Sequence, residues 1–324
     1  MLGAAKIAPT ALIKPARGFD EVEVAAIAAR DKAKAETFAR KHGIATVHDN
    51  YDALLADESI DAIYNPLPNG LHGKWTIAAL EAGKHVLCEK PFTANAHEAV
   101  EVAKVEARTG RVVMEAFHYR YHPLAQWMAD TVQGGALGAI ERIETWMIIP
   151  LLSRSDIRWQ LNLAGGSNMD VGCYTIHLLR TLARSEPTVT NASARELSPG
   201  IDKWLQADVT FAEGFSGRIT ASMRSRKFLS LGARVTGSGG VLRVFNPYAP
   251  HYFHRVSLET TSGDKPQVPK FPRVSTYRHQ LEAFVGAVRR GDPFPTGTAD
   301  AIANMKVIDA TYRAAGMEPR QPSG

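Results

Sequence analysis

The sequence predicts an α/β half with a doubly wound parallel sheet, followed by an α+β half with a large, mostly antiparallel sheet. Up to about residue 120, short apolar runs alternate with helical patterns of 10–15 residues, which is typical of parallel βαβ units. After this point, longer strands are separated by tight turns such as Glu213-Gly214 and Gly239-Gly240, which indicates an antiparallel meander. A chain of 324 residues also favours two domains. We therefore expect domains over residues 1–120 and 121–324.

The individual elements follow from the period of the apolar residues and from the residues that end each run. In the first half, Asp31 is a helix cap, and Gly43, Gly83 and Gly110 each end a helix. Strands are expected over 22–29, 60–64, 85–88 and 111–114, and helices over 31–42, 71–82 and 95–109. In the second half, strands are expected over 140–149, 204–211, 217–223, 233–237 and 241–245, helices over 121–132, 277–290 and 298–315, and a polar loop over 262–272.

Composition excludes several classes of protein. Lys and Arg exceed Asp and Glu by 38 − 33 = 5, and the basic residues form no long run, so we expect no nucleic-acid partner. No apolar run approaches the ~20 residues of a membrane span, and the first residues lack a signal-peptide pattern. Cys88 and Cys173 lie in apolar stretches, which predicts buried thiols in a reducing, cytoplasmic environment.

The first residues contain a relaxed form of the dinucleotide-binding fingerprint. Residues 3–8 read GAAKIA, in which Gly3 allows a tight turn and the small residues let backbone N–H groups approach a pyrophosphate. We expect Gly3, Ala5, Lys6 and Ile7 to contact the cofactor in a Rossmann domain. Only two residues precede Gly3, so the first strand is apparently truncated, and we hypothesise that the true start codon lies upstream. An in-frame apolar extension would support this hypothesis, and a stop codon just before Met1 would contradict it.

The end of the second strand indicates the type of nicotinamide cofactor. A carboxylate there usually binds the ribose 2′-hydroxyl of NAD, whereas this strand ends in Ala29 followed by Arg30. A guanidinium can pair with the 2′-phosphate of NADP. Asp31 is an alternative ribose ligand, but capping the next helix is the more economical role. The cofactor is therefore expected to be NADP, with NAD less favoured.

Three further segments resemble the Gfo/Idh/MocA family of oxidoreductases over nearly the whole chain. Residues 83–91, GKHVLCEKP, resemble the signature of the family; residues 65–69, NPLPN, with His72, look like its loop beside the nicotinamide; and residues 165–174, GGSNMDVGCY, look like its catalytic helix. Residues 28–31, AARD, and 114–120, MEAFHYR, are similar to the branch that holds dihydrodiol dehydrogenase and NADP-dependent xylose dehydrogenase. The sequence departs from the family pattern at Ala5, where the fingerprint has its second glycine, and at Ser167-Asn168, which is more polar than the usual pair.

This resemblance implies a set of cofactor contacts and a type of assembly. It implies a homodimer or higher homo-oligomer, formed through an exposed face of the antiparallel sheet, and an NADP-linked activity. It also suggests a cis bond between Lys90 and Pro91. The cofactor contacts that it adds are Pro66, Leu67, Asn69, His72, Glu89 and Lys90.

Tyr174 is the candidate base that removes the proton of a substrate hydroxyl group. A free phenol has a pKa near 10, and an adjacent ammonium group would lower it. Lys90 can supply this charge and can hydrogen-bond the substrate oxygen and the nicotinamide ribose. Asp170 lies on the same helical face as Tyr174 and could orient a substrate hydroxyl group or hold the tyrosine. In the reduction direction, Tyr174 returns the proton as an acid.

The remaining candidates would bind substrate oxygens or a sugar face. His118, Arg120 and Arg158 are expected to contact the substrate. Trp159 could stack on a sugar ring or belong to the core, and His177 could bind substrate or be a core histidine. A metal site formed by the histidines is disfavoured, because no His-Glu-x-x-His pattern occurs and hydride transfer needs no metal.

We therefore expect an NADP-dependent dehydrogenase that acts on CH–OH groups of a polyol, sugar or diol, such as an aldose, an inositol or a cyclic trans-dihydrodiol. Two alternatives stay open. One is an aldose–aldose oxidoreductase with tightly bound NADP, and the other is a non-catalytic NADP-binding sensor or assembly protein.

Overall fold

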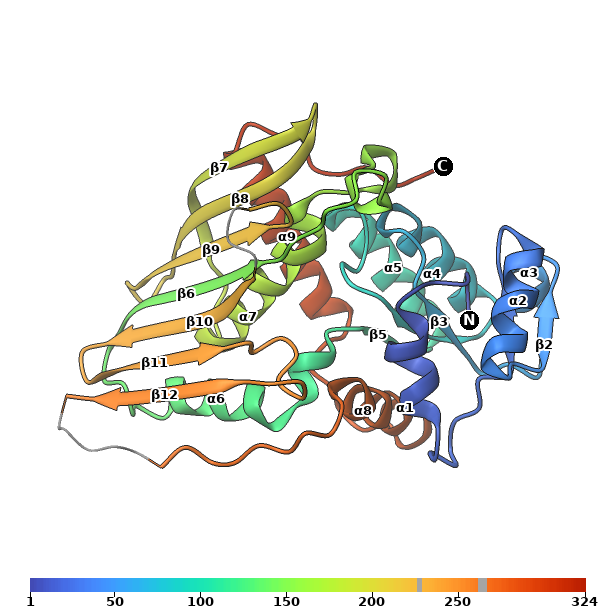
Figure 1. The fold of residues 1–324 in the computed structure, drawn as a ribbon, viewed down its shortest axis with the longest axis horizontal. Coiled ribbons are helices and arrows are strands. Elements are labelled where there is room, and N and C mark those ends of the chain that lie inside the picture. The colour runs from blue at the N-terminus through green and yellow to red at the C-terminus, as the bar shows by residue number, and fades with distance from the viewer. Residues whose placement is uncertain (226–228, 262–266) are drawn as a thin grey trace.

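The computed structural model describes residues 1–225, 229–261 and 267–324 and contains two packed parts with different sheets (Figure 1). The first part carries only parallel strands, and the second is built on one seven-stranded sheet. Both halves of the predicted fold class are therefore confirmed. In the parallel part, helices and strands alternate along the chain, as the sequence predicts.

The parallel strands form two groups joined through the first residues of the chain. The order is β2-β1 in one group and β3-β4-β5 in the other. Leu2 lies between the groups, with its N–H donating to the Tyr64 carbonyl at 3.0 Å and a parallel bridge to Ala28 on the other side. The strands are β1 Ala26–Ala28, β2 Thr46–His48, β3 Ala62–Asn65, β4 His85–Cys88 and β5 Val113–Glu115.

Helices cover both faces of this sheet, so it is doubly wound as expected. One face packs against α3 Tyr51–Leu55, α4 His72–Glu81 and α5 Ala96–Thr109. The other face packs against the helical segment Pro9–Ile13 with α1 Lys14–Ala16, against α2 Lys32–His42, and against α8 Thr276–Arg290. Asp31 caps α2 by accepting from the Lys34 N–H, and Gly43 ends α2 with a φ of +73°. The chain thus returns to its first half through α8, far from residue 120 in sequence.

The second sheet has the strand order β12-β11-β10-β6-β9-β8-β7. All neighbouring strands are antiparallel except β6 and β9, which run parallel because the chain leaves β6, passes through α7 and re-enters at the far edge. The strands are β6 Ile140–Ile148, β7 Thr188–Ser198, β8 Ile201–Thr210, β9 Ser216–Ser222, β10 Ser230–Gly237, β11 Gly240–Phe245 and β12 Arg255–Thr260.

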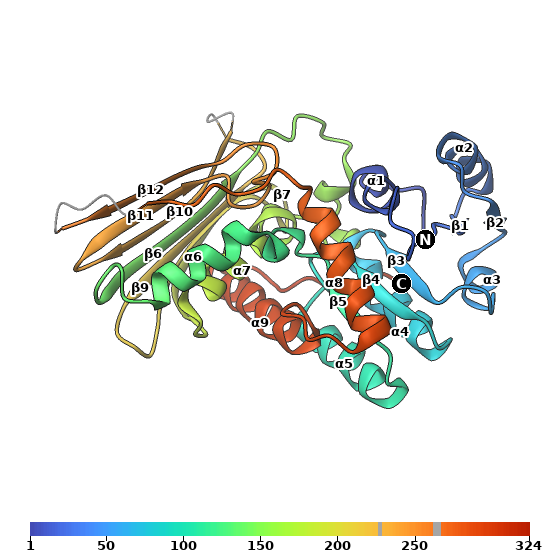
Figure 2. The ribbon, with the colours of Figure 1, turned by 90° about the horizontal axis from the view of Figure 1, so that it is seen from below.

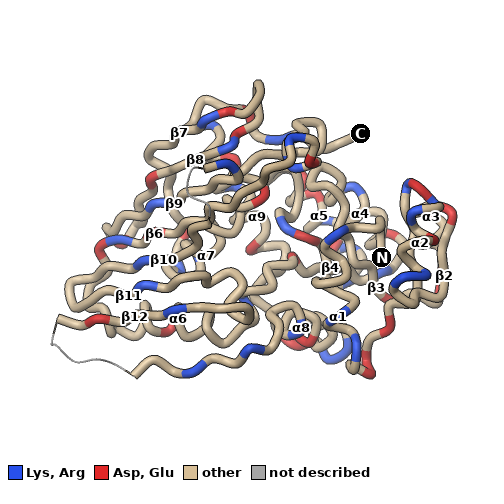
Figure 3. The backbone as a smooth tube through the Cα atoms, viewed as in Figure 1, with Lys and Arg blue, Asp and Glu red and all other residues tan. Residues whose placement is uncertain are grey.

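Three helices cover one face of this sheet, and no helix of the described residues covers the other (Figure 2). The covering helices are α6 Pro123–Gln133, α7 Cys173–Ala183 and α9 Thr298–Ala314. Basic and acidic residues alternate along the backbone of both parts (Figure 3). Within the described ranges, none of the helices has the length and apolar character needed to cross a membrane.

The structure differs from the prediction mainly at weakly patterned segments. The strand expected over 22–29 is limited to β1, because residues 22–25 form no ladder. Three edge strands, β2, β7 and β12, were not expected. None of them has a fully buried residue, so the alternation of buried apolar residues that marks a strand is missing there. Of the polar loop over 262–272, residues 262–266 lie outside the described residues, and 267–272 form neither helix nor strand.

Candidate active site

The carboxyl end of β4 brings Lys90 against the segment that opens α7. The Lys90 ammonium donates to the Asp170 backbone carbonyl at 3.0 Å and pairs with the Asp170 carboxylate at 3.3 Å. The other Asp170 oxygen accepts from Arg158 at 3.3 Å. The carboxylate is thus held between two cations. Burial alone would lower the pKa of Lys90, but Asp170 outweighs this effect, with help from Cys173 and Glu89, and the pKa lies above its usual 10.5.

Tyr174 lies in the first turn of α7, directly beside Lys90. The Lys90 Nζ atom is 5.0 Å from the centre of the tyrosine ring. The phenol is only 7% exposed and packs edge-on against Phe117 and Tyr248, at ring separations of 5.3 and 5.8 Å. The two residues on which the proposed chemistry depends therefore lie in contact, one from each half of the chain.

The pKa of Tyr174 moves in the direction opposite to the expected one. Burial raises it well above its usual value of 10, and the negative charges of Glu89 and Asp170 act in the same direction. Lys90 does not offset this effect, because its ammonium lies over the ring and its hydrogen bonds go to Asp170. The tyrosine is therefore a neutral phenol at physiological pH.

The fingerprint residues form a turn at the carboxyl end of the parallel strands. Gly3 has a φ of +76°, and its N–H donates to the Ala28 carbonyl at 2.7 Å. A Cβ atom at this position would lie 3.2 Å from the Leu67 side chain, so the glycine keeps the space between the turn and the 65–69 loop open. Lys6, Ile7 and Arg30 are exposed around this turn.

The loop that contains Pro66 and Leu67 is held by hydrogen bonds within the chain. The Asn65 side chain donates to the His72 carbonyl and to the Thr76 hydroxyl, both at 3.1 Å, and Asn69 donates to the Ala164 carbonyl at 3.1 Å. The Asn69 contact ties the nucleotide-binding half to the second half.

His72 and Glu89 are engaged with the protein rather than free to bind a ligand. The two ring nitrogens of His72 lie 2.7 and 2.6 Å from the carbonyl oxygens of Pro91 and Leu67, and the side chain is 1% exposed. Burial lowers its pKa to about 4, so the neutral ring donates to one carbonyl at a time. Glu89 accepts from the Tyr64 hydroxyl at 2.7 Å. His72 links the 65–69 loop to the Lys90–Pro91 segment, whose peptide bond is cis, and its expected contact with the cofactor stays a prediction.

Three of the expected substrate residues lie at the site: Asp170, described above, Arg158 and His118. Arg158 is held in place by a two-pronged contact to Asp156, at 2.9 and 3.1 Å, and by its bond to Asp170. The His118 ring lies 5.9 Å from the Tyr174 ring. His118 and Lys90 thus lie beside the phenol, and Arg158 is linked to Lys90 through Asp170.

Three other expected substrate residues lie elsewhere. Trp159 is 7% exposed and packs with Leu151, Val171 and Met223. Arg120 hydrogen-bonds Gln126 on the exposed side of α6. The structure thus places Trp159 in the core, which is one of its two expected roles, and Arg120 beside α6.

His177 also belongs to the core. Its Nδ1 atom bonds the Tyr119 hydroxyl, its Nε2 atom lies 2.9 Å from the Asp300 carboxylate, and Phe117 stacks on the ring at 4.0 Å. Both ring nitrogens have partners within the protein. Of the two expected roles of His177, the structure therefore favours the core histidine over the substrate ligand.

The sequence analysis missed four residues near the site: Tyr248 packs against the Tyr174 ring, Tyr277 packs on His118, and Thr276 and His251 form hydrogen bonds behind His118. Tyr248, His251, Thr276 and Tyr277 come from the segment after β11 and from the start of α8. The hydroxyl of Tyr248 is enclosed and has no hydrogen-bond partner among the described residues. No local motif marks these positions. Among the described residues, no three His, Cys, Asp or Glu side chains converge in a way that could hold a metal ion, and Cys88 and Cys173 are buried free thiols.

Comparison with known proteins extends over the whole chain. Residues 1–117 match the model of an oxidoreductase family with an NAD-binding Rossmann fold, and residues 125–243 match the GFO/IDH/MocA C-terminal domain. D-xylose 1-dehydrogenase (NADP(+)) 2 of Haloferax volcanii is 35% identical over 316 residues, which cover 97% of this chain and 96% of the relative. Trans-1,2-dihydrobenzene-1,2-diol dehydrogenase of Oryctolagus cuniculus is 31% identical over 230 residues, which cover 70% and 68%.

A similar solved structure is that of a 3-ketoreductase from Actinomadura kijaniata in complex with NADP and TDP-benzene. It superposes with a TM-score of 0.88 at 27% identity and covers 97% of this chain and 96% of that one. The relatives are NAD(P)-dependent dehydrogenases and reductases that act on sugars or diols. The chain therefore belongs to the Gfo/Idh/MocA family of oxidoreductases.

Proposed function

We propose that this chain is an NADP-dependent oxidoreductase that transfers a hydride between the nicotinamide and a hydroxylated ring substrate. The substrate would be an aldose, an inositol or a cyclic trans-dihydrodiol, with Tyr174 as general acid and base and Lys90 as its partner. The observation that carries the proposal is the contact of the Lys90 ammonium with the Tyr174 ring at 5.0 Å. In this proposal, residues 1–120 bind the cofactor and 121–324 bind the substrate, in a reducing, cytoplasmic setting that suits the buried thiols.

The residues at the carboxyl edge of the parallel sheet fit a dinucleotide. The Gly3 turn leaves a space that a Cβ atom would fill, and backbone N–H groups there suit a pyrophosphate. Arg30 is exposed at the end of β1, where its guanidinium can pair with a 2′-phosphate, and Asp31 is occupied as a helix cap. These features favour NADP over NAD. Bound NADP would supply the hydride acceptor or donor.

Tyr174 would handle the proton at the reacting oxygen. Because burial keeps the phenol neutral, the side chain can donate its proton to the oxygen of a carbonyl group during reduction. In the direction of oxidation, the phenolate would take the proton of the substrate hydroxyl group. Oxidation should therefore accelerate as the pH rises, whereas reduction should not.

Lys90 and Arg158 would hold the oxygens of the substrate against the phenol. Asp170 balances the two cations and fixes their positions, since each donates to one of its oxygens. In this role, Asp170 acts on the substrate through Lys90 and Arg158.

The test is a panel of aldoses, inositols and trans-dihydrodiols, with the reduction of NADP⁺ followed by absorbance. Tyr174→Phe should lower turnover by roughly 10²–10⁴-fold and leave the Kd for NADP within a few-fold, because only the proton transfer is lost. Tyr121→Phe is the matched control, since this phenol bonds Thr296 outside the site. If the two variants behave alike, Tyr174 is structural and the proposal fails.

The two alternative functions predict other results in the same experiments. NADP that survives purification, together with hydride exchange between two sugars, would indicate an aldose–aldose oxidoreductase. Tight NADP binding with no turnover of any panel member would indicate a non-catalytic sensor or assembly protein.

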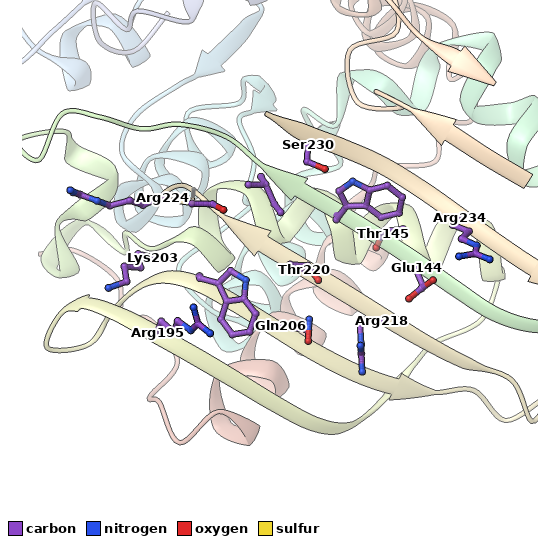
Figure 4. A pocket seen from close by; sticks show the side chains of 14 residues that line it. Glu144, Thr145, Arg195, Lys203, Gln206, Arg218, Thr220, Arg224, Ser230 and Arg234 are labelled. Carbon is purple, nitrogen blue, oxygen red and sulfur yellow. The ribbon is translucent and has the colours of Figure 1, made fainter. Parts of the chain in front are cut away.

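We also propose that the uncovered face of the seven-stranded sheet mediates homodimerisation. Trp146 and Trp204 lie on this face around a hollow of about 1150 Å³, and the guanidinium of Arg195 lies 5.0 Å from the Trp204 ring (Figure 4). Large aromatic and arginine side chains of this kind are enriched at protein interfaces. Light scattering should give the mass of a dimer or a higher oligomer, and Trp204→Glu should shift the oligomeric state towards the monomer. A monomeric wild type would contradict the proposal.

A further inference from the structure

A buried hydroxyl group joins two histidines beside Tyr174. Thr276, the first residue of α8, is fully buried. Its Oγ1 atom lies 2.7 Å from Nδ1 of His118 and 3.0 Å from Nδ1 of His251. The three residues come from the turn after β5, the segment after β11 and the start of α8, so only the folded chain brings them together.

The hydrogen atoms in this cluster can be assigned by elimination. The Thr276 backbone N–H points at Nδ1 of His251 at 3.5 Å, which favours an unprotonated Nδ1. An unprotonated nitrogen 3.0 Å from the Thr276 oxygen requires the hydroxyl proton between the two atoms, so we infer that the hydroxyl group donates to His251. The Thr276 oxygen can therefore only accept from His118, which places the proton of the neutral His118 ring on Nδ1 and leaves a lone pair on Nε2.

The His118 ring lies between the aromatic residues of the site and the buried threonine. The ring packs on Tyr277 at 4.0 Å and meets Tyr174 edge-on at 5.9 Å. Among the described residues, nothing hydrogen-bonds Nε2, and this atom is not one of the fully enclosed unpartnered ones. Burial lowers the pKa of His118 to about 3, and the facing charges of His251 and Lys90 act in the same direction. The ring therefore stays neutral at physiological pH, and its Nε2 atom is an accessible acceptor on a ring next to Tyr174.

We propose that Thr276 and His251 are positioning residues that fix His118 as a hydrogen-bond acceptor, so that the site selects substrates with a hydroxyl group on the carbon next to the reacting carbon. The inference rests on the proposed function, in which Tyr174 serves the reacting oxygen. A neighbouring hydroxyl group can donate to His118 Nε2. A deoxy carbon offers no donor, and a neighbouring carbonyl group offers only a second acceptor, which the lone pair repels. All three substrate classes of the proposed function carry this neighbouring hydroxyl group, so His118 would select them against analogues that have a deoxy carbon or a carbonyl group at that position.

The kinetic test compares two substrates that differ by one hydroxyl group. An aldose or cyclic diol that is turned over is paired with its analogue, which has hydrogen in place of the hydroxyl group next to the reacting carbon. The wild type should prefer the hydroxylated member in kcat/KM by roughly tenfold to a hundredfold, the cost of leaving a buried acceptor unpaired. Thr276→Val and His118→Phe should reduce this preference to within a few-fold, and Thr276→Ser should restore it.

Thr109→Val is the control for the loss of a threonine hydroxyl, because Thr109 bonds a carbonyl within α5, away from the site. It should leave the preference unchanged. An unchanged preference in Thr276→Val would overturn the inference. If Thr276→Val fails to fold, Thr276→Ser and His118→Phe still test the inference. It requires Thr276→Ser to keep the preference for the hydroxylated substrate and His118→Phe to lose it.

A second readout needs no turnover. Nitrogen-15 NMR reports the protonation of each imidazole nitrogen, and the His118 signals can be assigned because they are absent from His118→Phe. The spectrum should show a protonated Nδ1 and an unprotonated Nε2 for His118. A proton on Nε2 in the wild type would refute the positioning role. If no panel member is turned over, the proposed function fails and the substrate selection fails with it, whereas the tautomer still supports or refutes the action of Thr276 on His118.

Discussion

Asp300, at the start of α9, offers a quantitative test of the buried network behind the active site. Its two carboxylate oxygens lie 2.9 Å from His177 Nε2 and 2.9 Å from an Arg180 nitrogen. The side chains of His177 and Arg180 are 2% and 6% exposed, and that of Asp300 is 24% exposed. Burial would raise the pKa of Asp300, but His177 and Arg180 outweigh it and hold the value at about 2, against the usual 3.8.

The lowered pKa of Asp300 means that its ionised form stabilises the folded protein. Going from 3.8 to about 2 corresponds to ~2.5 kcal/mol of unfolding free energy. Because the folded-state pKa is the lower one, this contribution is present above pH 3.8 and is lost as the pH falls towards 2. Asp300→Asn removes the charge and should therefore cost about 2–3 kcal/mol at neutral pH, and the cost should shrink as the medium is acidified.

Urea unfolding of the wild type and Asp300→Asn over a series of pH values measures the contribution of Asp300 to the free energy of unfolding. The contributions of the other carboxylates are the same in both proteins and cancel in the comparison. Asp292→Asn is the surface control, because its partner Arg290 is 54% exposed, and it should cost less than about 1 kcal/mol at every pH. A loss in Asp300→Asn that stays constant from neutral to acid pH would refute the charge argument.

Three further predictions follow from single side chains. Arg30→Ala should weaken NADP binding by about 1.5–3 kcal/mol and leave NAD within a few-fold, measured by fluorescence titration of the reduced cofactors; equal losses would contradict a contact to the 2′-phosphate. Trp159→Ala should cost about 3–5 kcal/mol in urea unfolding, whereas Trp159→Phe should retain KM, and a raised KM in a stable Trp159→Phe would restore the sugar-stacking role. Gly166→Ala places a Cβ atom 2.1 Å from an Asp202 oxygen and 2.8 Å from an Arg320 nitrogen, so it should disrupt this buried ion pair and cost about 3–5 kcal/mol; a melting temperature equal to that of the wild type would contradict this packing.

The fold was predictable where burial leaves a pattern in the sequence. Strands such as β3 and β4 are buried runs between helices that end at glycines, so period and length identify them. The edge strand β7 exposes most of both faces, and its identity comes from pairing with β8, which no local pattern reveals.

The candidate site was predictable where chemistry and sequence position coincide. Lys90 and Tyr174 are carried by motifs, and they meet in the structure. His72 and His177 were not predictable in the same way, because what decides their roles is the carbonyl or carboxylate that each meets after folding, and Asp300 lies 123 residues from His177. Thr276 and His251 stand in no motif, and only their contacts with His118 mark them.

The pKa of Tyr174 also depends on a third residue. The ammonium of Lys90 is balanced by Asp170, and this carboxylate itself raises the pKa of the phenol. Asp170→Asn removes that negative charge and leaves the Lys90 charge unbalanced, so the pKa of Tyr174 should fall.

The pH profile of kcat for oxidation should then shift to lower pH in Asp170→Asn, while the corresponding profile of Asp156→Asn, which loses a charge held by Arg158 alone, should move less. A large loss of activity with an unshifted profile would mean that Asp170 contacts the substrate directly. The direction of the shift thus separates an electrostatic role of Asp170 from a binding role, since only the former acts through the proton of Tyr174.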